Sequence, residues 1–111
     1  MNISMDELQN KVGETRKERG FVQDPHQIFA LLVEEVGEIS AELKRLWSPN
    51  YTDFSRDDLR DEIADAQVCL FALANQFAIS VNAAVEDKFF TRDAQRNWKS
   101  LSQVKDREGG C

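Results

Sequence analysis

Two pairs of acidic residues at helical spacing constrain the fold of this chain more than any other feature. Glu35 and Glu38 are three residues apart, and so are Glu62 and Asp65. In an α-helix this spacing places both side chains of a pair on one side of the helix. Four converging carboxylates would repel one another unless cations lay between them. Oxygen ligands of this kind suit hard cations, so a shared site would hold Mg²⁺ or Mn²⁺.

Apolar residues at alternating steps of three and four place both pairs on amphipathic helices. The first pair falls within a helix predicted from Pro25 to Trp47, and the second within a helix that follows Ser55 and ends near Ile79. The apolar rows predicted to face the core are Phe29, Leu32, Val36, Ile39, Leu43 and Leu46 on the first helix, and Leu59, Ile63, Ala66, Leu70, Leu73 and Phe77 on the second.

Two further helices are predicted outside this pair. The earlier one covers residues 5 to about 19, with Ser4 as its N-cap, and ends before Gly20. The later one covers residues 81 to about 98 and follows an N-cap at Ser80. Its residues predicted to face inward are Ala84, Val85, Phe89 and Phe90.

No stretch of the sequence alternates in the manner of a β-strand. We therefore expect an all-α fold, an antiparallel bundle of about four helices over residues 1–99. The polar segment 100–111 is expected to be a frayed tail. The apolar stripe of the first helix is thin, so the bundle is expected to bury its remaining apolar surface by self-association.

Composition narrows the classes of partner. The chain has 111 residues, enough for one domain, and a net charge of -6. An acidic protein gains little from nucleic acid or anionic membrane, so we expect stable binding to neither. Its cysteines, Cys69 and Cys111, fit neither a zinc site nor a disulfide framework, and the N-terminus lacks the pattern of a signal peptide. These features predict a cytoplasmic protein.

Helix geometry predicts that the two acidic pairs meet. At about 100° per residue, Glu35 and Glu38 lie about 70° and 130° from the centre of their apolar row. Glu62 and Asp65 lie about 60° and 120° from the centre of theirs, with the same rotational sense. Equal rotations bring the pairs to one side of an antiparallel interface, which a short connecting loop favours. An EExxE pattern alone usually marks a solvated helix face. The prediction therefore rests on the matching angles of the two acidic pairs.

The acidic pattern resembles the signature of the MazG-like, all-α nucleoside triphosphate pyrophosphohydrolases over about residues 8 to 97. Glu34-Glu35-x-x-Glu38 matches its EExxE part, and Glu62-x-x-Asp65 matches its ExxD part. The resemblance implies a Mg²⁺-dependent enzyme that cleaves (d)NTP between the α and β phosphorus to (d)NMP and pyrophosphate, in the service of nucleotide-pool house-cleaning. It further implies metal ligation by Glu35, Glu38, Glu62 and Asp65, assistance from Glu34, and a homodimer or homotetramer.

Basic and aromatic residues are the candidates for substrate binding. The segment 87–92 resembles a basic stretch of the same family, and its Lys88 and Arg92 could clamp the pyrophosphate group. Phe21, His26 and Trp47 are candidates for contact with the base.

Other functions stay open on the sequence alone. Glu86 stands where some family members carry an asparagine, and Asp58 where a basic residue is found. A related all-α pyrophosphohydrolase acting on dUTP, dUDP or phosphoribosyl-ATP is therefore an alternative. A non-catalytic helical interaction module is another. A di-iron bundle is disfavoured because neither acidic pair has the histidine of a Glu-x-x-His motif.

Overall fold

The computed structural model describes residues 2–104, and all regular structure in that range is helical. The all-α prediction is thereby confirmed. The elements are α1 (Met5–Glu18), α2 (Pro25–Trp47), α3 (Arg56–Asn75), α4 (Val81–Val85), the π-helix η1 (Glu86–Arg92), and the 3₁₀ turns η2 (Asp93–Gln95) and η3 (Leu101–Val104).

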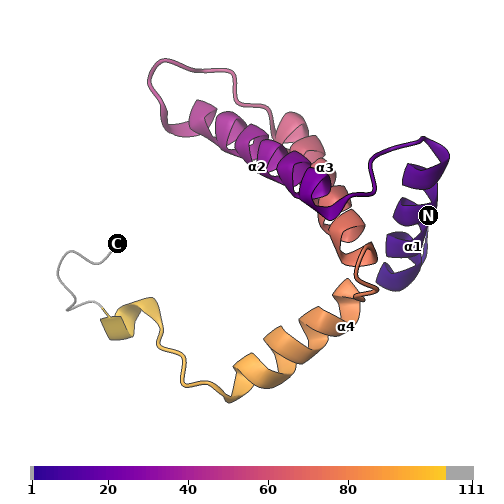
Figure 1. Cartoon of the computed structure of the whole chain (residues 1–111). Helices are drawn as coiled ribbons and strands as arrows, with labels where there is room; N and C mark the ends of the chain where they lie inside the picture. The colour runs from indigo at the N-terminus through magenta and orange to yellow at the C-terminus, as the bar shows by residue number, and fades with distance from the viewer. Residues whose placement is uncertain (1, 105–111) are drawn as a thin grey trace.

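The helices form an open arrangement (Figure 1). Helices α2 and α3 lie side by side, α1 packs against α3, and α4 leaves the end of α3 and projects away from the other helices. The Cα radius of gyration is 18.0 Å, against about 13 Å for a compact domain of this length. The predicted four-helix bundle is therefore not formed by residues 2–104, because α4 contacts α1 and projects away from α2 and α3.

A buried polar contact fixes the direction in which α4 leaves. The side chain of Gln9 on α1 is 4% exposed. Its amide nitrogen donates to Asn75 Oδ1 at 2.9 Å and to the Ile79 carbonyl at 2.7 Å, and its oxygen accepts from the Val81 N–H at 3.0 Å. These three bonds join α1 to the end of α3 and to the first residue of α4.

The predicted last helix differs from the structure in form and in burial. It begins as predicted after Ser80, whose side chain accepts from the Ala83 N–H at 3.0 Å. The α-helix ends at Val85 and continues as a π-helix and a 3₁₀ turn rather than running to residue 98. The side chains predicted to face inward are exposed, because the projecting segment leaves the other helices after its contact with α1: Ala84, Val85, Phe89 and Phe90.

Helices α1 and α3 end in the same kind of turn. After α1, the Phe21 N–H donates to the Arg16 carbonyl at 2.9 Å, around Gly20 at φ 70°. After α3, the Ile79 N–H donates to the Ala74 carbonyl at 3.0 Å, around Ala78 at φ 53°. Both are Schellman-type ends, which require a left-handed residue that is usually glycine. The predicted end of the third helix near Ile79 was wrong because an alanine gives no sign of this turn.

We predict opposite effects of substitution at these two turns. Gly20→Ala places a Cβ at a left-handed position and should lower the free energy of unfolding by about 1 kcal/mol. Ala78→Gly removes that strain and should change stability little or raise it by up to about 1 kcal/mol. Urea denaturation of the two variants beside the parent checks this. A loss of stability in Ala78→Gly as large as in Gly20→Ala would contradict the assignment.

The rows through which α2 and α3 meet differ from those predicted. The buried or half-buried rows are Ile28, Leu32, Glu35, Ile39 and Glu42 on α2, and Leu59, Glu62, Ala66, Cys69 and Leu73 on α3. Seven of the residues predicted to face the core are exposed instead, among them Phe29 at 56% and Ile63 at 53%: Phe29, Val36, Leu43, Leu46, Ile63, Leu70 and Phe77. Relative to the predicted orientation, both helices are thus rotated so that Glu35, Glu42 and Glu62 lie in the rows that face each other.

The predicted tail is described in part, from its first residues to residue 104. The predicted tail 100–111 begins with the turn η3, and residues 105–111, including Cys111, lie outside the described range. Within the described range, every helix is too short or too polar to cross a bilayer.

Candidate metal centre

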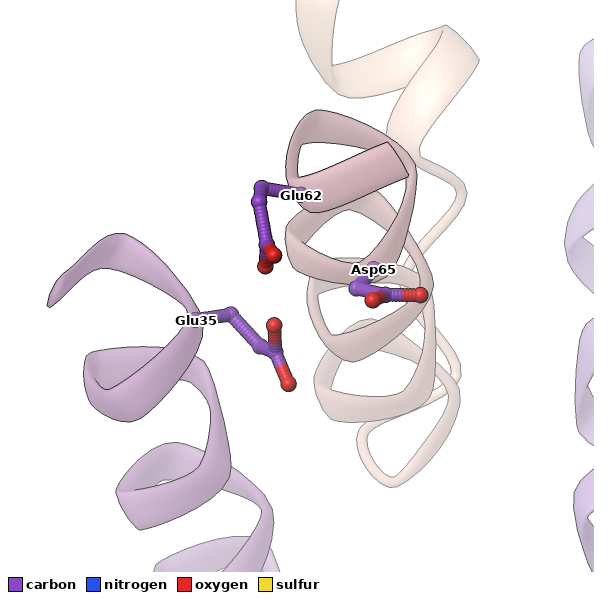
Figure 2. A group of neighbouring side chains, drawn as sticks. All are labelled: Glu35, Glu62 and Asp65. Atoms are coloured by element: carbon purple, nitrogen blue, oxygen red, sulfur yellow. The ribbon is translucent and has the colours of Figure 1, made fainter. Parts of the chain in front are cut away.

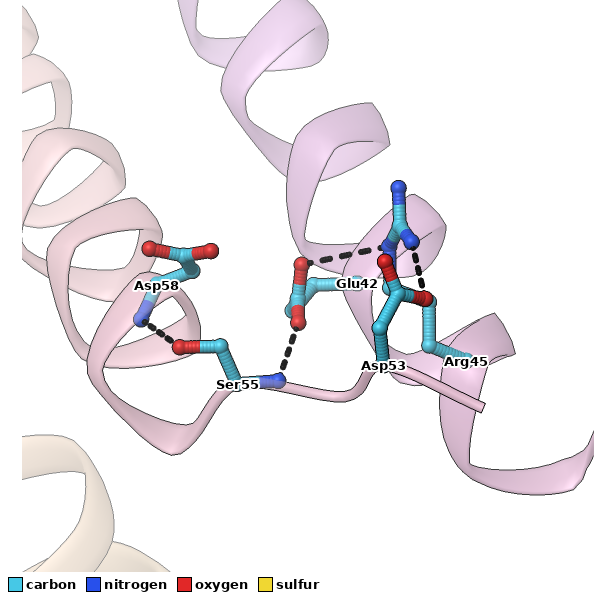
Figure 3. A network of polar contacts seen from close by, with 5 residues as sticks. All are labelled: Glu42, Arg45, Asp53, Ser55 and Asp58. Atoms are coloured by element: carbon cyan, nitrogen blue, oxygen red, sulfur yellow. Dashed lines mark hydrogen bonds and ion pairs between the residues drawn. The ribbon is translucent and has the colours of Figure 1, made fainter. Parts of the chain in front are cut away.

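The loop between α2 and α3 sets how the two helices align (Figure 3). Glu42 near the end of α2 accepts a hydrogen bond from the backbone N–H of Ser55 at 2.7 Å. The Ser55 hydroxyl in turn caps α3 by accepting from the Asp58 N–H at 3.1 Å. Arg45 joins the network through Glu42 at 3.6 Å and Asp53 at 2.5 Å. The side chain of one helix thereby holds the first turn of the other.

This contact fixes the position of the acidic residues farther along the pair. Glu35 precedes Glu42 by seven residues, and Glu62 follows Ser55 by seven. Seven residues are about two helical turns on each helix. Because α2 and α3 run antiparallel, the register that pairs Glu42 with Ser55 also pairs Glu35 with Glu62.

We predict that removal of the Glu42 acceptor destabilises the hairpin. Glu42→Ala leaves the part-buried Ser55 N–H without its partner, which should cost about 1 kcal/mol or more of unfolding free energy. Glu42→Gln is the matched control because it keeps an oxygen acceptor and should lose less. Urea denaturation of both variants measures the difference. Equal stability of Glu42→Ala and Glu42→Gln would show that this bond does not hold the register.

Three carboxylates converge at the paired positions (Figure 2). Glu35 from α2 and Glu62 and Asp65 from α3 each offer one oxygen, and these oxygens all lie within 4.8 Å of one another. Glu35 and Glu62 are half-buried, whereas Asp65 is exposed. The predicted meeting of the two acidic pairs is therefore confirmed for these three side chains.

Glu38 and Glu34 lie at the edge of this cluster. Both are exposed, and neither belongs to the group of three. Their charges nevertheless act on it: Glu38 raises the pKa of Glu35 and of Glu62, and Glu34 raises the pKa of Glu35. The charge of Glu38 therefore acts on the cluster, although its carboxylate is not among the three that meet.

Burial and mutual repulsion disfavour the charged forms of Glu35 and Glu62. Burial raises the pKa of Glu35, and the charges of Asp65 and Glu62 raise it further. The pKa of Glu62 is raised by burial and by Glu38 and Asp65, while a hydrogen bond with Glu35 offsets part of the rise. Cations bound between these groups would remove the repulsion that causes part of both shifts.

The donor set fits a small hard cation. All the groups are carboxylate oxygens, the ligand type that Mg²⁺ and Mn²⁺ take in proteins. Two oxygens bound to one Mg²⁺ lie about 3 to 4 Å apart, given Mg–O distances of about 2.1 Å. Small side-chain rotations would bring oxygens within 4.8 Å of one another to that spacing. Because Asp65 is exposed, part of such a site would face solvent and a ligand.

We predict that the metal-free protein becomes less stable as the pH rises through the raised pKa values of Glu35 and Glu62. Between the pKa of an unfolded glutamate and these raised values, the folded state binds more protons than the unfolded state, so its stability falls with increasing pH. Melting temperatures in a chelating buffer across the acid-to-neutral range should show this loss. The double variant Glu35→Gln, Glu62→Gln should lack this component, and an unchanged pH slope in it would contradict the shifts.

The other predicted substrate-binding residues do not gather around the cluster. His26 is exposed in the first turn of α2, and Trp47, 73% exposed, is the last residue of that helix. The helix between them spans about 30 Å, so they cannot contact the same base within one chain. Phe21 lies beside α1, where its ring is 5.7 Å from the Arg16 guanidinium.

The predicted phosphate-binding residues lie on the projecting segment. Lys88 pairs with Asp93 at 2.5 Å, and Arg92 pairs with Asp87 at 3.1 Å. The π-helix that carries both cations packs mainly against α4 and η2. Within one chain, the structure therefore does not bring Lys88 and Arg92 to the acidic cluster.

Cys69 is a neighbour of the cluster that the sequence did not single out for function. It lies in the α3 row that faces α2, one turn beyond Asp65. Burial raises the pKa of its thiol, and Glu35 and Asp65 add to the rise, with Arg16 opposing it. The four-residue step from Asp65 was the available signal, but Cys69 lies in an apolar stretch of the helix and was interpreted as a free structural thiol.

Comparisons with known proteins add no relative. No protein-family model, curated protein or solved structure matches the chain. Any functional conclusion therefore rests on the geometry of the described residues.

Proposed function

We propose that the protein is a Mg²⁺-dependent pyrophosphohydrolase of the MazG-like type, which cleaves (d)NTP between the α and β phosphorus to (d)NMP and pyrophosphate. The observation that carries the proposal is the meeting of Glu35, Glu62 and Asp65, which come from two helices and lie far apart in sequence. Burial and then the neighbouring charges raise the pKa of Glu35 and of Glu62, so their meeting carries a cost that a bound cation would offset.

In this proposal the cluster holds the metal that the reaction requires. Glu35, Glu62 and Asp65 would bind Mg²⁺ directly, and Glu38 would complete the site from the next turn of α2. When bound, the metal supplies positive charge for the phosphate oxygens and makes water a better nucleophile. Glu34, beside Glu35 and exposed to solvent, would orient the attacking water.

The charge of the acidic cluster favours one class of substrate. A polyanionic triphosphate can approach these carboxylates only with cations between them, which favours a metal-bound phosphate compound. The candidates for its recognition stay Lys88, Arg92, Phe21, His26 and Trp47. Within residues 2–104, no contact joins them to the cluster. The related reactions on dUTP, dUDP or phosphoribosyl-ATP therefore stay alternatives.

The proposed setting is a cytoplasmic homodimer or homotetramer that removes unwanted nucleotides from the pool. The open shape supports self-association, since a radius of gyration of 18.0 Å leaves little interior in one chain. A net charge of -6 supports the absence of stable nucleic-acid binding.

A non-catalytic interaction module is the rival favoured by the many exposed apolar side chains. Such a module would need no metal and would release no pyrophosphate. A panel of nucleotides with Mg²⁺, assayed for pyrophosphate, separates it from the enzyme.

We predict that Asp65→Asn and Glu38→Gln each lower Mg²⁺-dependent pyrophosphate release by about 100-fold or more, because each removes charge that would hold the metal. Asp61→Asn is the matched control: Asp61 is an exposed acid on the same helix, paired with Arg60 at 3.5 Å, and its variant should keep full turnover. Circular dichroism should show unchanged helix content in all three.

Two results would count against the enzyme. Full turnover in both Asp65→Asn and Glu38→Gln would remove the cluster from the reaction. No turnover by the parent protein across the panel, which includes dUTP and phosphoribosyl-ATP, would favour the interaction module.

A further inference from the structure

A small pocket lies where α1 packs against α3, and its walls are mostly apolar. Its volume is about 250 Å³. The apolar walls come from three parts of the chain: Leu8 and Val12 on α1, Phe21 after α1, and Val68 on α3. The polar residues that line it are Lys11, Thr15, Arg16 and Arg19. The pocket thus combines hydrocarbon walls with three cations, and no acidic side chain of the described residues lines it.

Arg16 is a buried cation without a counter-charge. Its side chain is 6% exposed. Its Nη1 donates to the Val22 carbonyl at 2.9 Å, and its guanidinium lies 5.7 Å from the centre of the Phe21 ring. Within residues 2–104, no carboxylate forms an ion pair with it. Buried charges are normally paired, because removing a lone charge from water is costly. The surroundings of Arg16 therefore lack an anion.

Part of the Arg16 guanidinium is free to bind one. An arginine has five N–H donors, and only Nη1 has a hydrogen-bond partner among the described residues. Every fully buried side-chain nitrogen in that range has a partner, so Nε and Nη2 must still reach solvent. A carboxylate accepts N–H donors of this kind at two oxygens.

The charge around the pocket is opposite to that of the whole chain. The net charge of the chain is -6, yet the charged side chains that line the pocket are all basic. Lys11 and Arg19 are exposed at its rim, and neither forms an ion pair within the described range. Arg16 and Arg19 are three residues apart, a spacing at which like charges repel each other. An anion between them would remove this repulsion.

We propose that the pocket between α1 and α3 binds a small amphipathic anion, a carboxylate with a hydrocarbon body. The carboxylate pairs with Arg16 and is attracted by Lys11 and Arg19, and the hydrocarbon body lies against the apolar walls. Pockets for drug-sized ligands occupy about 300–1,000 Å³, so this smaller one suits a short chain or a single ring. The proposal does not rest on the hydrolysis of a nucleotide.

The hydrogen-bonding groups of the pocket argue against a nucleobase as its ligand. Its polar side chains are donors, and only Thr15 also offers an oxygen that can accept. Nucleobases carry N–H donors beside their acceptors, and these donors would be left without partners. A carboxylate carries acceptors only, and a hydrocarbon body needs no partner. Phe21, a candidate for contact with the base, thus serves a different ligand here.

The test is a titration of the full, isotope-labelled chain with octanoate at neutral pH, without metal or nucleotide. The NMR signals of the Thr15, Arg16 and Val68 amides should shift and saturate at one ligand per chain. Octanol, which has the same chain without the charge, should bind about 10-fold more weakly or worse, because it loses charged hydrogen bonds. Hexanoate should bind about 15-fold more weakly, since each of two lost CH₂ groups contributes a factor of about four.

Variants separate the buried cation from the rim. Arg16→Gln should weaken octanoate about 10-fold or more and leave the affinity for octanol unchanged. Lys11→Gln with Arg19→Gln changes only exposed side chains, so it decides the result if Arg16→Gln fails to fold. It should weaken octanoate about threefold at low salt and less at high salt. Lys17→Gln with Arg60→Gln is the matched control, because it removes two charges from exposed positions that do not line the pocket. It should bind octanoate like the parent.

Four results would overturn the proposal. They are equal affinity for octanol and octanoate, unchanged affinity in Lys11→Gln with Arg19→Gln, shifts confined to other parts of the chain, and displacement of octanoate by a nucleoside triphosphate. The last result would assign the pocket to the nucleotide. A chain that binds octanoate as described but releases no pyrophosphate would support this site and overturn only the proposed reaction.

Discussion

The register between α2 and α3 is the constraint on which the rest of the molecule depends. Glu42 on α2 binds the first residue before α3, and the loop between them is tied down by Arg45 and Asp53. Two turns farther along both helices, the same register brings Glu35 against Glu62. A slip of one residue would rotate one acidic side chain by about 100° away from the other. A contact in a loop thus sets the geometry of a site about 10 Å away.

The same alignment gives the hairpin two unlike sides at a cost to the isolated chain. Glutamates occupy positions in the facing rows that apolar residues could fill, and the pKa of Glu35 is raised by burial and by its neighbours. On the other side, Phe29, Val36 and Ile63 remain in water. The buried carboxylates destabilise the metal-free chain, and a bound cation would relieve this cost. The exposed apolar side chains add no stability as long as nothing covers them.

The sequence predicted much of this, because its signals were local. Pro25 after Asp24, Ser55 before two aspartates and Ser80 before the last helix are capping patterns, and each helix begins where its cap predicted. The meeting of Glu35 with Glu62 and Asp65 was also predicted, although the two glutamates lie in the facing rows and not beside them. Gly20 correctly predicted the end of α1, since a left-handed position favours glycine.

What could not be predicted depends on contacts between distant residues. Ala78 adopts a left-handed conformation because the bonds of Gln9 to Asn75 and Ile79 surround that turn, and no local pattern shows them. The residues through which α2 faces α3 were predicted incorrectly for a similar reason. Phe29 and Val36 look like core residues by periodicity, yet both are more than half exposed among the described residues. Periodicity identifies an apolar face but not the molecule that buries it.

The most direct measurement is a crystal structure of the protein grown with Mn²⁺, with anomalous scattering recorded at the manganese edge. The account predicts an anomalous peak between α2 and α3, coordinated by oxygens of Glu35, Glu62 and Asp65. Manganese bound elsewhere with none at this position, or these three side chains turned apart into solvent, would contradict it.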